Sequence, residues 1–291
     1  MRHAAALIGT ALSLYLSVHI AFLIVQLDPV RALLGPLATP EAVTAYRAQL
    51  GLDRSFLNGV FIALWRLIRL DFGVSYFQGV PAITLVGETA SGTLFRAAAA
   101  ILLGLTSGII GAVLMARVRG AVAIAAGLAA VPSLVWIVLL LWTVANGLGA
   151  TPLGAPRIFD FLTVLISAVI PASTCAAYMI TKLSDRGQTE SYPLLLRQLG
   201  APRRAVAVIV LRHELAPLLM LAVNAVPAVV SAVAVAELIY GVPGLGALLI
   251  RACVRGDLPV IHAATLLLAL IYFILQRLAT VAVSWNDARH A

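Results

Sequence analysis

Charged residues are scarce in this sequence. Asp, Glu, Lys and Arg together make up 11% of its 291 residues, whereas 62% are hydrophobic and the mean hydropathy is +1.03. A chain with so little charge has too much apolar surface to fold as one water-soluble domain. Cysteine is equally scarce: Cys175 and Cys253 are the only two, and their wide separation gives neither a disulfide framework nor a metal-binding spacing.

Sequence motifs of enzymes are missing as well. No Gly-x-Ser-x-Gly nucleophile motif is present, and the only lysine, Lys182, does not follow the Gly-rich pattern of a phosphate-binding loop. His213-Glu214 resembles the start of a zinc-protease motif, but Pro217 stands where that motif requires its second histidine. We therefore expect no catalytic residue, no metal site and no cofactor on this chain.

Long apolar runs occupy most of the sequence. A helix needs about 20 mostly apolar residues to cross roughly 30 Å of hydrocarbon. Six runs qualify, near residues 5–27, 93–115, 121–146, 161–181, 215–240 and 259–284. We predict an all-α polytopic membrane protein with about six transmembrane helices, divided into a first helix (1–27), an extracytoplasmic helical segment (28–92) and a core (93–291).

The distribution of basic residues predicts the orientation. Positive charge is retained on the cytoplasmic side during insertion, and a cytoplasmic N-terminus places Arg117, Arg119, Lys182 and Arg197 in inner loops. The outer segments then carry as many acids as bases, so both termini are predicted to be cytoplasmic. The net charge of +8 is spread over loops, which favours contact with anionic membrane lipid rather than with nucleic acid.

The segment 28–92 is predicted to contain two helices. Thr39 is a suitable N-cap, Pro40 suits the first helical position, and Gly51 suits the end, so one helix should cover residues 40–50. A second helix over 55–70 would place apolar residues on one side, namely Phe56, Val60, Ala63, Leu64 and Leu67. That pattern is typical of a surface helix with one packed face.

Polar residues within apolar spans are costly and often functional. We take four of them as candidates for lining a translocation path: Ser133, Asn146, Asn224 and Ser231. Ordinary helix packing is the alternative for each. Four prolines free backbone carbonyls and can bend their helices, namely Pro132, Pro171, Pro217 and Pro227. Arg96 lies near the end of a span. We therefore expect its side chain to extend to the membrane–water interface, which costs less free energy than burial of its charge in the bilayer.

A short basic helix-turn-helix pattern separates the fourth and fifth apolar runs, within a loop of about residues 183–213. Gly200 permits a left-handed helix end, and Pro202 can begin the next helix. The arginines around it can meet acids or carbonyls of a partner. This loop is therefore predicted to be a binding site for another protein.

Several segments resemble one family, the membrane permease subunit of dipeptide, oligopeptide and nickel importers of the ABC class. The similar segments, in chain order, are Asp28-Pro29-Val30-Arg31-Ala32-Leu33-Leu34-Gly35, Thr39-Pro40-Glu41-Ala42, Leu50-Gly51-Leu52-Asp53-Arg54, Leu70-Asp71-Phe72-Gly73-Val74-Ser75, Glu237-Leu238-Ile239-Tyr240-Gly241-Val242-Pro243-Gly244-Leu245-Gly246 and Asp257-Leu258-Pro259-Val260. They extend over nearly the whole chain. The resemblance implies a bacterial inner-membrane protein with the fold of a type I ABC importer permease.

The same resemblance implies roles for particular residues. The loop between spans four and five would be a coupling helix that docks on an ATPase subunit, through Tyr192, Leu196, Arg197, Gly200, Arg203 and Arg204. Leu196 differs from the family, which usually has a small Ala at that position. Docking candidates for an extracytoplasmic binding protein are Asp71, Gly73, Glu237, Gly241, Pro243, Gly244, Gly246 and Asp257.

The resemblance further implies the partners and the mechanism. A second permease would complete a heterodimer, two ATPase subunits would carry ATP and Mg, and an extracytoplasmic protein would deliver the solute. Peptides are the expected solute, with nickel, opine-like chelates and sugars as alternatives. An ion-coupled secondary transporter is the alternative class, although it would need ionisable groups deep in the spans, and an intramembrane enzyme would need an active-site set that the sequence lacks.

Overall fold

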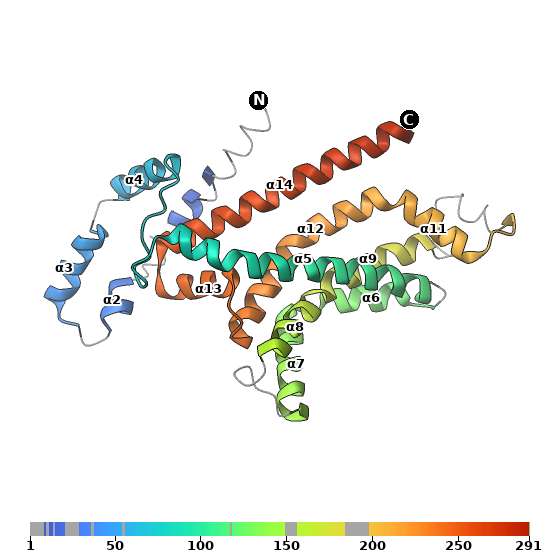
Figure 1. Ribbon diagram of the computed structural model, residues 1–291, viewed down its shortest axis with the longest axis horizontal. Coiled ribbons are helices and arrows are strands. Elements are labelled where there is room, and N and C mark those ends of the chain that lie inside the picture. Colours follow the sequence, from blue (N-terminus) through green and yellow to red (C-terminus); the bar gives the residue numbers. More distant parts are fainter. Residues whose placement is uncertain are drawn as a thin grey trace. The chain divides into compact units, whose positions relative to one another are not determined.

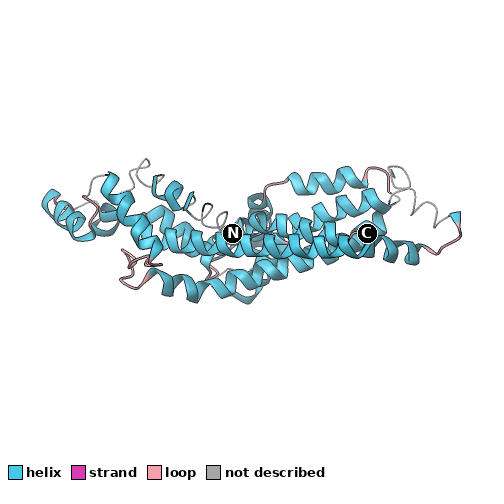
Figure 2. Ribbon diagram, turned by 90° about the horizontal axis from the view of Figure 1, so that it is seen from above, coloured by secondary structure: helices cyan, strands magenta, loops and turns pink. Residues whose placement is uncertain are grey.

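The protein is almost entirely helical (Figure 1). The computed structural model describes residues 9, 12–13, 15–20, 29–35, 38–53, 56–116, 118–148, 156–183 and 198–290. The helices in chain order are α2 (Pro29–Leu34), α3 (Pro40–Leu50), α4 (Phe56–Ile68), α5 (Ala82–Met115), α6 (Ala121–Ala130), α7 (Ser133–Leu148), α8 (Pro156–Ser167), α9 (Val169–Leu183), α11 (Arg203–His213), α12 (Leu215–Tyr240), α13 (Leu245–Arg255) and α14 (Leu258–His290). Figure 2 shows helices and connecting loops, without a strand among the described residues. The all-α prediction is confirmed.

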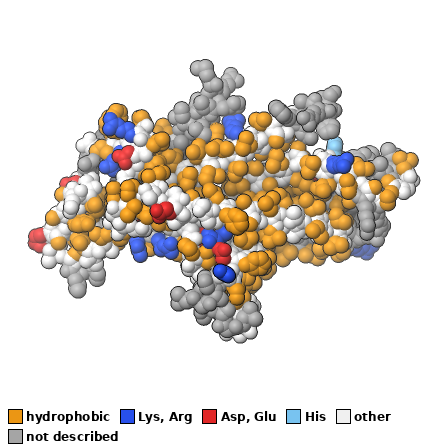
Figure 3. All heavy atoms as spheres, viewed as in Figure 1, with side chains coloured by type: hydrophobic (Ala, Val, Ile, Leu, Met, Phe, Trp, Pro, Cys, Tyr) orange, Lys and Arg blue, Asp and Glu red, His pale blue; other side chains and the backbone are white. Residues whose placement is uncertain are grey.

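Among the described residues, four helical stretches are long and apolar enough to cross a membrane: Ala82–Met115, Arg157–Leu183, Leu215–Tyr240 and Leu258–Ser284. Hydrophobic side chains dominate the surface seen in Figure 3, as expected for a protein surrounded by lipid. The predicted first span, over residues 5–27, lies largely outside the described residues. The count of six spans therefore stays a prediction.

The predicted third span is not one straight helix. It divides into α6 and α7, which meet at 85°. Pro132 causes the break because it has no N–H to donate, and the residue before a proline avoids helical geometry. Val131 accordingly has extended angles, with φ −72° and ψ 123°. The pair forms either a broken span or a re-entrant loop.

Two further prolines fall four residues after a helix interruption. Pro171 follows Ser167, the last residue of α8, and Pro217 follows His213, the last residue of α11. A proline ring clashes with the carbonyl four residues earlier and cannot bond to it, so each helix is interrupted at that point. The helices are thus interrupted at both sites, while Pro227 lies inside the uninterrupted α12, and bending at these three prolines stays a prediction.

In the segment 28–92, helix α3 begins and ends where the sequence predicted. Ala42 N–H donates to Thr39 Oγ1 at 3.3 Å, and Gly51 ends the helix with a left-handed φ of 67°. Helix α4 ends at Ile68, two residues before the predicted Leu70. Of its predicted apolar face, Leu64 and Leu67 are half-buried, while the side chains of the other three lie outside the described part.

Helix α13 is a feature that the sequence analysis did not predict. The sequence analysis placed no helix between the apolar runs 215–240 and 259–284. Instead Gly244 precedes an amphipathic helix that buries Leu245 and Leu248 and ends at Gly256, whose φ is 75°. The run was too short to qualify as a span, and two glycines and a proline at its start obscured the helical periodicity.

The chain forms two compact units. Unit 1 comprises Met1–Ser91 and Pro243–Phe273, and unit 2 comprises Gly92–Val242 and Ile274–Ala291. In unit 2, α6 packs along α9, and α12 packs on α7, α8 and α9. The core of unit 2 includes Cys175, Met179, Val206 and Val210 in one cluster. The predicted three-part division of the chain stays a prediction.

Candidate functional site

An ionic cluster is buried within unit 2. Arg96 on α5 donates through Nε to Asp160 Oδ1 at 2.5 Å and through Nη1 to Glu237 Oε1 at 3.0 Å. Glu237 on α12 has no exposed surface and also accepts a hydrogen bond from Thr93 Oγ1 at 2.7 Å. The cluster joins three helices through charges that are expensive to bury unless they are paired.

This cluster changes the interpretation of two residues. Arg96 does not extend to an interface, because its side chain is only 10% exposed and bonded on both sides. Glu237 was a docking candidate, but a fully buried carboxylate has no surface to offer a soluble partner. We assign Glu237 an internal role. This pair could not be predicted from the sequence, because Arg96 and Glu237 are far apart in the chain. Only the packing of their helices brings them together.

A second buried acid lies where α11 meets α12. Glu214 is 2% exposed and accepts a hydrogen bond from Tyr178 Oη, while Lys182 Nζ lies 3.3 Å from Glu214 Oε1. Tyr178 and Lys182 are in the last turns of α9. These contacts, which we name the 178–182–214 clasp, connect the helix before the predicted coupling loop to the helices after it. Glu214 is thus held by these contacts, whereas His213 is exposed, and no group of three potential metal ligands occurs in the described part of the chain.

The predicted coupling residues lie only partly within the described residues. Tyr192, Leu196 and Arg197 lie outside the described residues, and Arg203 and Arg204, described by their backbone alone, begin α11. Gly200 has the expected left-handed backbone, with φ 79°. Their role in coupling stays a prediction.

Two pore candidates share one side of α12. Asn224 and Ser231 are both exposed and are seven residues apart, about two helical turns. The opposite side of α12 is buried, through Val223, Val226 and Val233 among others. Ser231 Oγ donates to the carbonyl of Pro227 at 2.8 Å, which satisfies its hydroxyl within the helix.

The other two pore candidates lie at opposite ends of α7. Ser133 begins the helix and is half-buried, whereas Asn146 is exposed and donates through Nδ2 to the Trp142 carbonyl at 2.8 Å. The structure therefore brings Asn224 and Ser231 together but does not place Ser133 beside Asn146.

The outer-face candidates in unit 1 include one buried acid. Asp257 is 4% exposed and accepts hydrogen bonds from Ser75 Oγ at 2.5 Å and from Tyr76 N at 3.2 Å. Asp71 is exposed and accepts from Gly73 N at 2.9 Å, which favours the left-handed φ of 79° at Gly73. These bonds organise the chain between α4 and α5.

The remaining outer-face candidates surround the start of α13. Pro243 is exposed, whereas Gly244 and Gly246 are buried. In unit 2, Gly241 is exposed and ends α12 with φ 69°. Asp71 and Pro243 are therefore the exposed docking candidates of unit 1, and binding at these residues stays a prediction.

One close helix contact escaped the sequence analysis. A Cβ added to Gly104 would lie 2.8 Å from the Ala168 carbonyl oxygen, and one added to Gly108 would lie 2.5 Å from that of Ala172. The helix α5 thus approaches the backbone of the α8–α9 segment directly. The Gly-x-x-x-Gly spacing of these two residues is the signal that could have predicted this contact.

Comparison with known proteins gives consistent similarities. Residues 100–290 match the family described as binding-protein-dependent transport system inner membrane component. The chain is 27% identical to a Brucella abortus protein provisionally named a peptide transport system permease protein, over 93% of this chain and 92% of the relative. It is 27% identical to a metal-staphylopine import system permease protein of Staphylococcus aureus, over 84% and 81%. It is 25% identical to a dipeptide transport system permease protein of Lactococcus lactis, over 96% and 95%.

Proposed function

Since this chain belongs to the family of inner-membrane components of binding-protein-dependent transport systems, it is a permease subunit of an ABC importer, and we propose that it forms half of a pore for short peptides. The match over residues 100–290, on helices long and apolar enough to cross a membrane, carries this conclusion. Such a permease works with ATPase and substrate-binding partners. The chain itself is a transport component rather than an enzyme.

The proposed solute is a short peptide. Two of the relatives above are named for peptide or dipeptide transport, and one is named for import of metal-staphylopine. The exposed side of α12 with Asn224 and Ser231 offers amide and hydroxyl groups on a helix whose other exposed residues are apolar. Such groups suit a path for a polar solute, so we propose that this side faces the pore.

The proposed assembly contains a second permease, two ATPase subunits and an extracytoplasmic binding protein, surrounded by membrane lipid. ATP and Mg would bind the ATPase subunits, and both termini of this chain would be cytoplasmic. The binding protein would contact the outer segment and the residues near α13. Closure of the ATPases on ATP would favour one of two arrangements of the permeases and so drive alternating access.

Coupling is proposed to occur through the loop that contains Gly200. The 178–182–214 clasp supports this role because it fastens the two ends of the loop to the helices of unit 2. A force applied to the loop would then move α9, α11 and α12 together. The left-handed Gly200 sets the direction in which the chain leaves the loop.

Uptake by a glycine variant tests this proposal. No atom lies within 4 Å of a Cβ added at Gly200, so Gly200→Val acts through its backbone conformation alone. In proteoliposomes containing the whole importer, we expect this variant to insert normally but lose ATP-dependent, vanadate-sensitive uptake of a labelled dipeptide. Gly120→Val is the matched control, because Gly120 has φ 82° and equally open space but lies before α6.

Two results would reject the proposal. Wild-type uptake by Gly200→Val would remove the coupling role from this loop. Dipeptide uptake that needs no ATP and resists vanadate would contradict the importer mechanism itself.

A further inference from the structure

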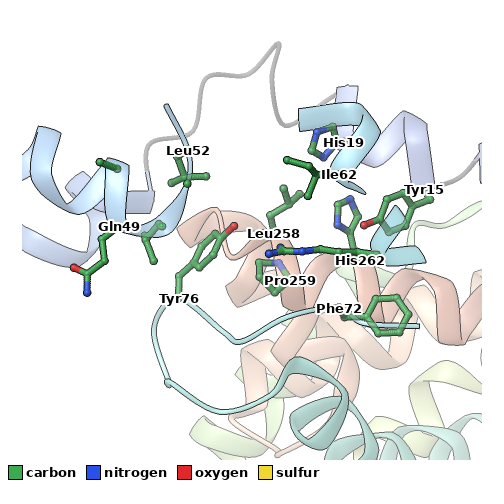
Figure 4. Close-up of a pocket in the computed structure, with 14 residues that line it drawn as sticks. Tyr15, His19, Gln49, Leu52, Ile62, Phe72, Tyr76, Leu258, Pro259 and His262 are labelled. Carbon is green, nitrogen blue, oxygen red and sulfur yellow. The ribbon is translucent and has the colours of Figure 1, made fainter. Parts of the chain in front are cut away.

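Unit 1 contains a pocket of about 230 Å³ (Figure 4). The transport function proposed above assigns no role to this pocket. Its walls come from the first helical residues, the end of α3, α4, the segment before α5 and the start of α14. The apolar part of the lining includes Leu52, Ile62, Phe72, Leu258 and Pro259. The volume is below the roughly 300 Å³ at which sites for drug-sized molecules begin, so it suits a smaller ligand or one end of a larger one.

Two histidines at the pocket have unused hydrogen-bonding atoms. His262 is 4% exposed and His19 is 7% exposed. In the described part of the chain, His19 Nδ1, His19 Nε2 and His262 Nε2 are buried and have no hydrogen-bond partner. Buried polar atoms are nearly always bonded, and a cluster of three unbonded nitrogens beside a cavity points to a ligand that supplies the missing bonds.

The histidine rings are held in place by aromatic stacking. The Tyr15 and His262 rings are 4.0 Å apart between centroids and inclined by 21°, and the His19 ring is 5.7 Å from that of His262. Figure 4 shows these three side chains gathered at one side of the pocket. A fixed ring presents its nitrogens in a fixed direction, which lowers the entropy cost of binding a ligand.

The charge at the pocket is positive. Arg66 is the one charged residue in the lining, and no Asp or Glu is among the lining residues that the structure describes. Its guanidinium makes no ion pair and no hydrogen bond with the described residues. The nearby acids are bonded elsewhere, Asp71 to Gly73 N and Asp257 to Ser75 and Tyr76 N.

Hydrogen-bond donors prevail in the polar lining. A neutral imidazole offers one N–H, and a guanidinium offers five. Burial and the Asp257 carboxylate raise the pKa of Tyr76 to about 12, so its phenol keeps its proton at neutral pH. Donors, one fixed positive charge and apolar walls together match the chemistry of a carboxylate or phosphate group attached to an apolar body.

We propose that this pocket binds an oxyanion, with Arg66 at its open side and His19 and His262 at its buried side. The oxyanion would be the carboxylate of a small solute or the phosphate of a membrane lipid headgroup. A transition metal is the other ligand that histidines favour. The Arg66 charge opposes a cation, and no third His, Cys, Asp or Glu joins the two histidines in the part of the chain that the structure describes.

Binding to the purified whole importer in neutral detergent tests the site. The probes are the dipeptide Ala-Phe, its C-terminal amide and phosphatidylglycerol, measured by calorimetry for the peptides and by native mass spectrometry for the lipid. Arg66→Gln removes the charge. Arg69→Gln is the matched control, because Arg69 is an exposed arginine in the turn just after α4, stacks on Trp65 at 4.6 Å from its ring, and does not line the pocket.

Each source of oxyanion gives a distinct result. If a solute carboxylate binds, Ala-Phe should bind about tenfold or more tightly than its amide, and Arg66→Gln should abolish that preference while Arg69→Gln keeps it. If a lipid phosphate binds, phosphatidylglycerol should remain bound to wild type and Arg69→Gln but not to Arg66→Gln. His262→Asn should weaken whichever probe binds.

Two outcomes would overturn the proposal. One is that none of the three probes binds Arg66→Gln and Arg69→Gln differently. The other is that Ni²⁺ binds wild type and Arg66→Gln equally but not His262→Asn, which would identify a metal site. Neither outcome bears on ATP-dependent uptake, so failure of this site is distinguishable from failure of the proposed transport function.

Discussion

Arg96 Nη1 lies 3.0 Å from Glu237 Oε1, and this contact joins α5 to α12 in the interior of unit 2. Thr93 donates a hydrogen bond to Glu237, and Asp160 accepts one from Arg96. A buried charge that loses its partner retains its full cost of desolvation, whereas removal of both charges leaves no such cost. The stability of the protein should therefore depend strongly on whether both charges of the pair are present.

Removal of one charge of this pair should destabilise the protein. We expect Arg96→Met to cost about 3–5 kcal/mol, because Glu237 remains buried without its cation. The double variant Arg96→Met with Glu237→Leu should recover part of that loss. Asp160→Asn is the control, with a smaller effect, because the Asp160 side chain is 52% exposed and its charge is less costly to leave unpaired. Thermal unfolding midpoints in detergent measure all three, and equal losses for the single and double variants would contradict the pairing.

The close approach of α5 to the α8–α9 segment predicts opposite effects at two glycines. A Cβ at Gly108 would lie 2.5 Å from the Ala172 carbonyl oxygen, whereas one at Gly111 would have no atom within 4 Å. Gly108→Ala should therefore lower the unfolding midpoint. Gly111→Ala should leave it unchanged or raise it, by up to about 1 kcal/mol of helix propensity. Similar midpoints for the two variants would show that the helices are not in backbone contact at Gly108.

Loss of the 178–182–214 clasp should uncouple ATP hydrolysis from uptake. Lys182→Met leaves the Glu214 carboxylate buried without its cation, so the ends of the coupling loop should loosen. We expect several-fold less dipeptide uptake per ATP hydrolysed in proteoliposomes. Tyr178→Phe removes one hydrogen bond to the same carboxylate and should have a smaller effect. An unchanged ratio in Lys182→Met would exclude the clasp from coupling.

If the exposed side of α12 with Asn224 and Ser231 faces the pore, a large side chain on that side should reduce uptake. Ser231→Trp should block uptake by filling the path, while leaving assembly with the partner subunits intact. Leu219→Trp, at another exposed position of α12, should be tolerated. Uptake rate and co-purification of the ATPase subunits distinguish a blocked pore from a misassembled one. Normal uptake by Ser231→Trp would place this side of the helix away from the pore.

The sequence predicted those elements whose signals are local. Helix α3 follows from Thr39, Pro40 and Gly51, each of which acts within one turn. Helix α12 has the predicted ends, Leu215 and Tyr240, because an apolar run is bounded by an acid and a glycine. The family could be identified from short segments spread over the chain, which need no knowledge of packing.

Other features depend on contacts between distant residues. The pairing of Arg96 with Glu237 and the clasp at Glu214 arise from helix packing that no local pattern specifies. The angle between α6 and α7 is similar: Pro132 predicts a bend, but its 85° size depends on the surrounding helices. The histidine pocket likewise brings together the first helix and the start of α14, which are remote in the sequence.

The most direct test of the account is a crosslink from the coupling loop to an ATPase subunit. Leu199 and Val254 are both 74% exposed, the first beside Gly200 and the second on α13, predicted to be extracytoplasmic. Each is replaced by Cys in a Cys253→Ser background, and the whole importer is treated with a short bismaleimide. Leu199→Cys should crosslink to the ATPase subunit and Val254→Cys should not. A crosslink from Val254→Cys but none from Leu199→Cys would contradict both the orientation of the chain and the coupling role of its loop.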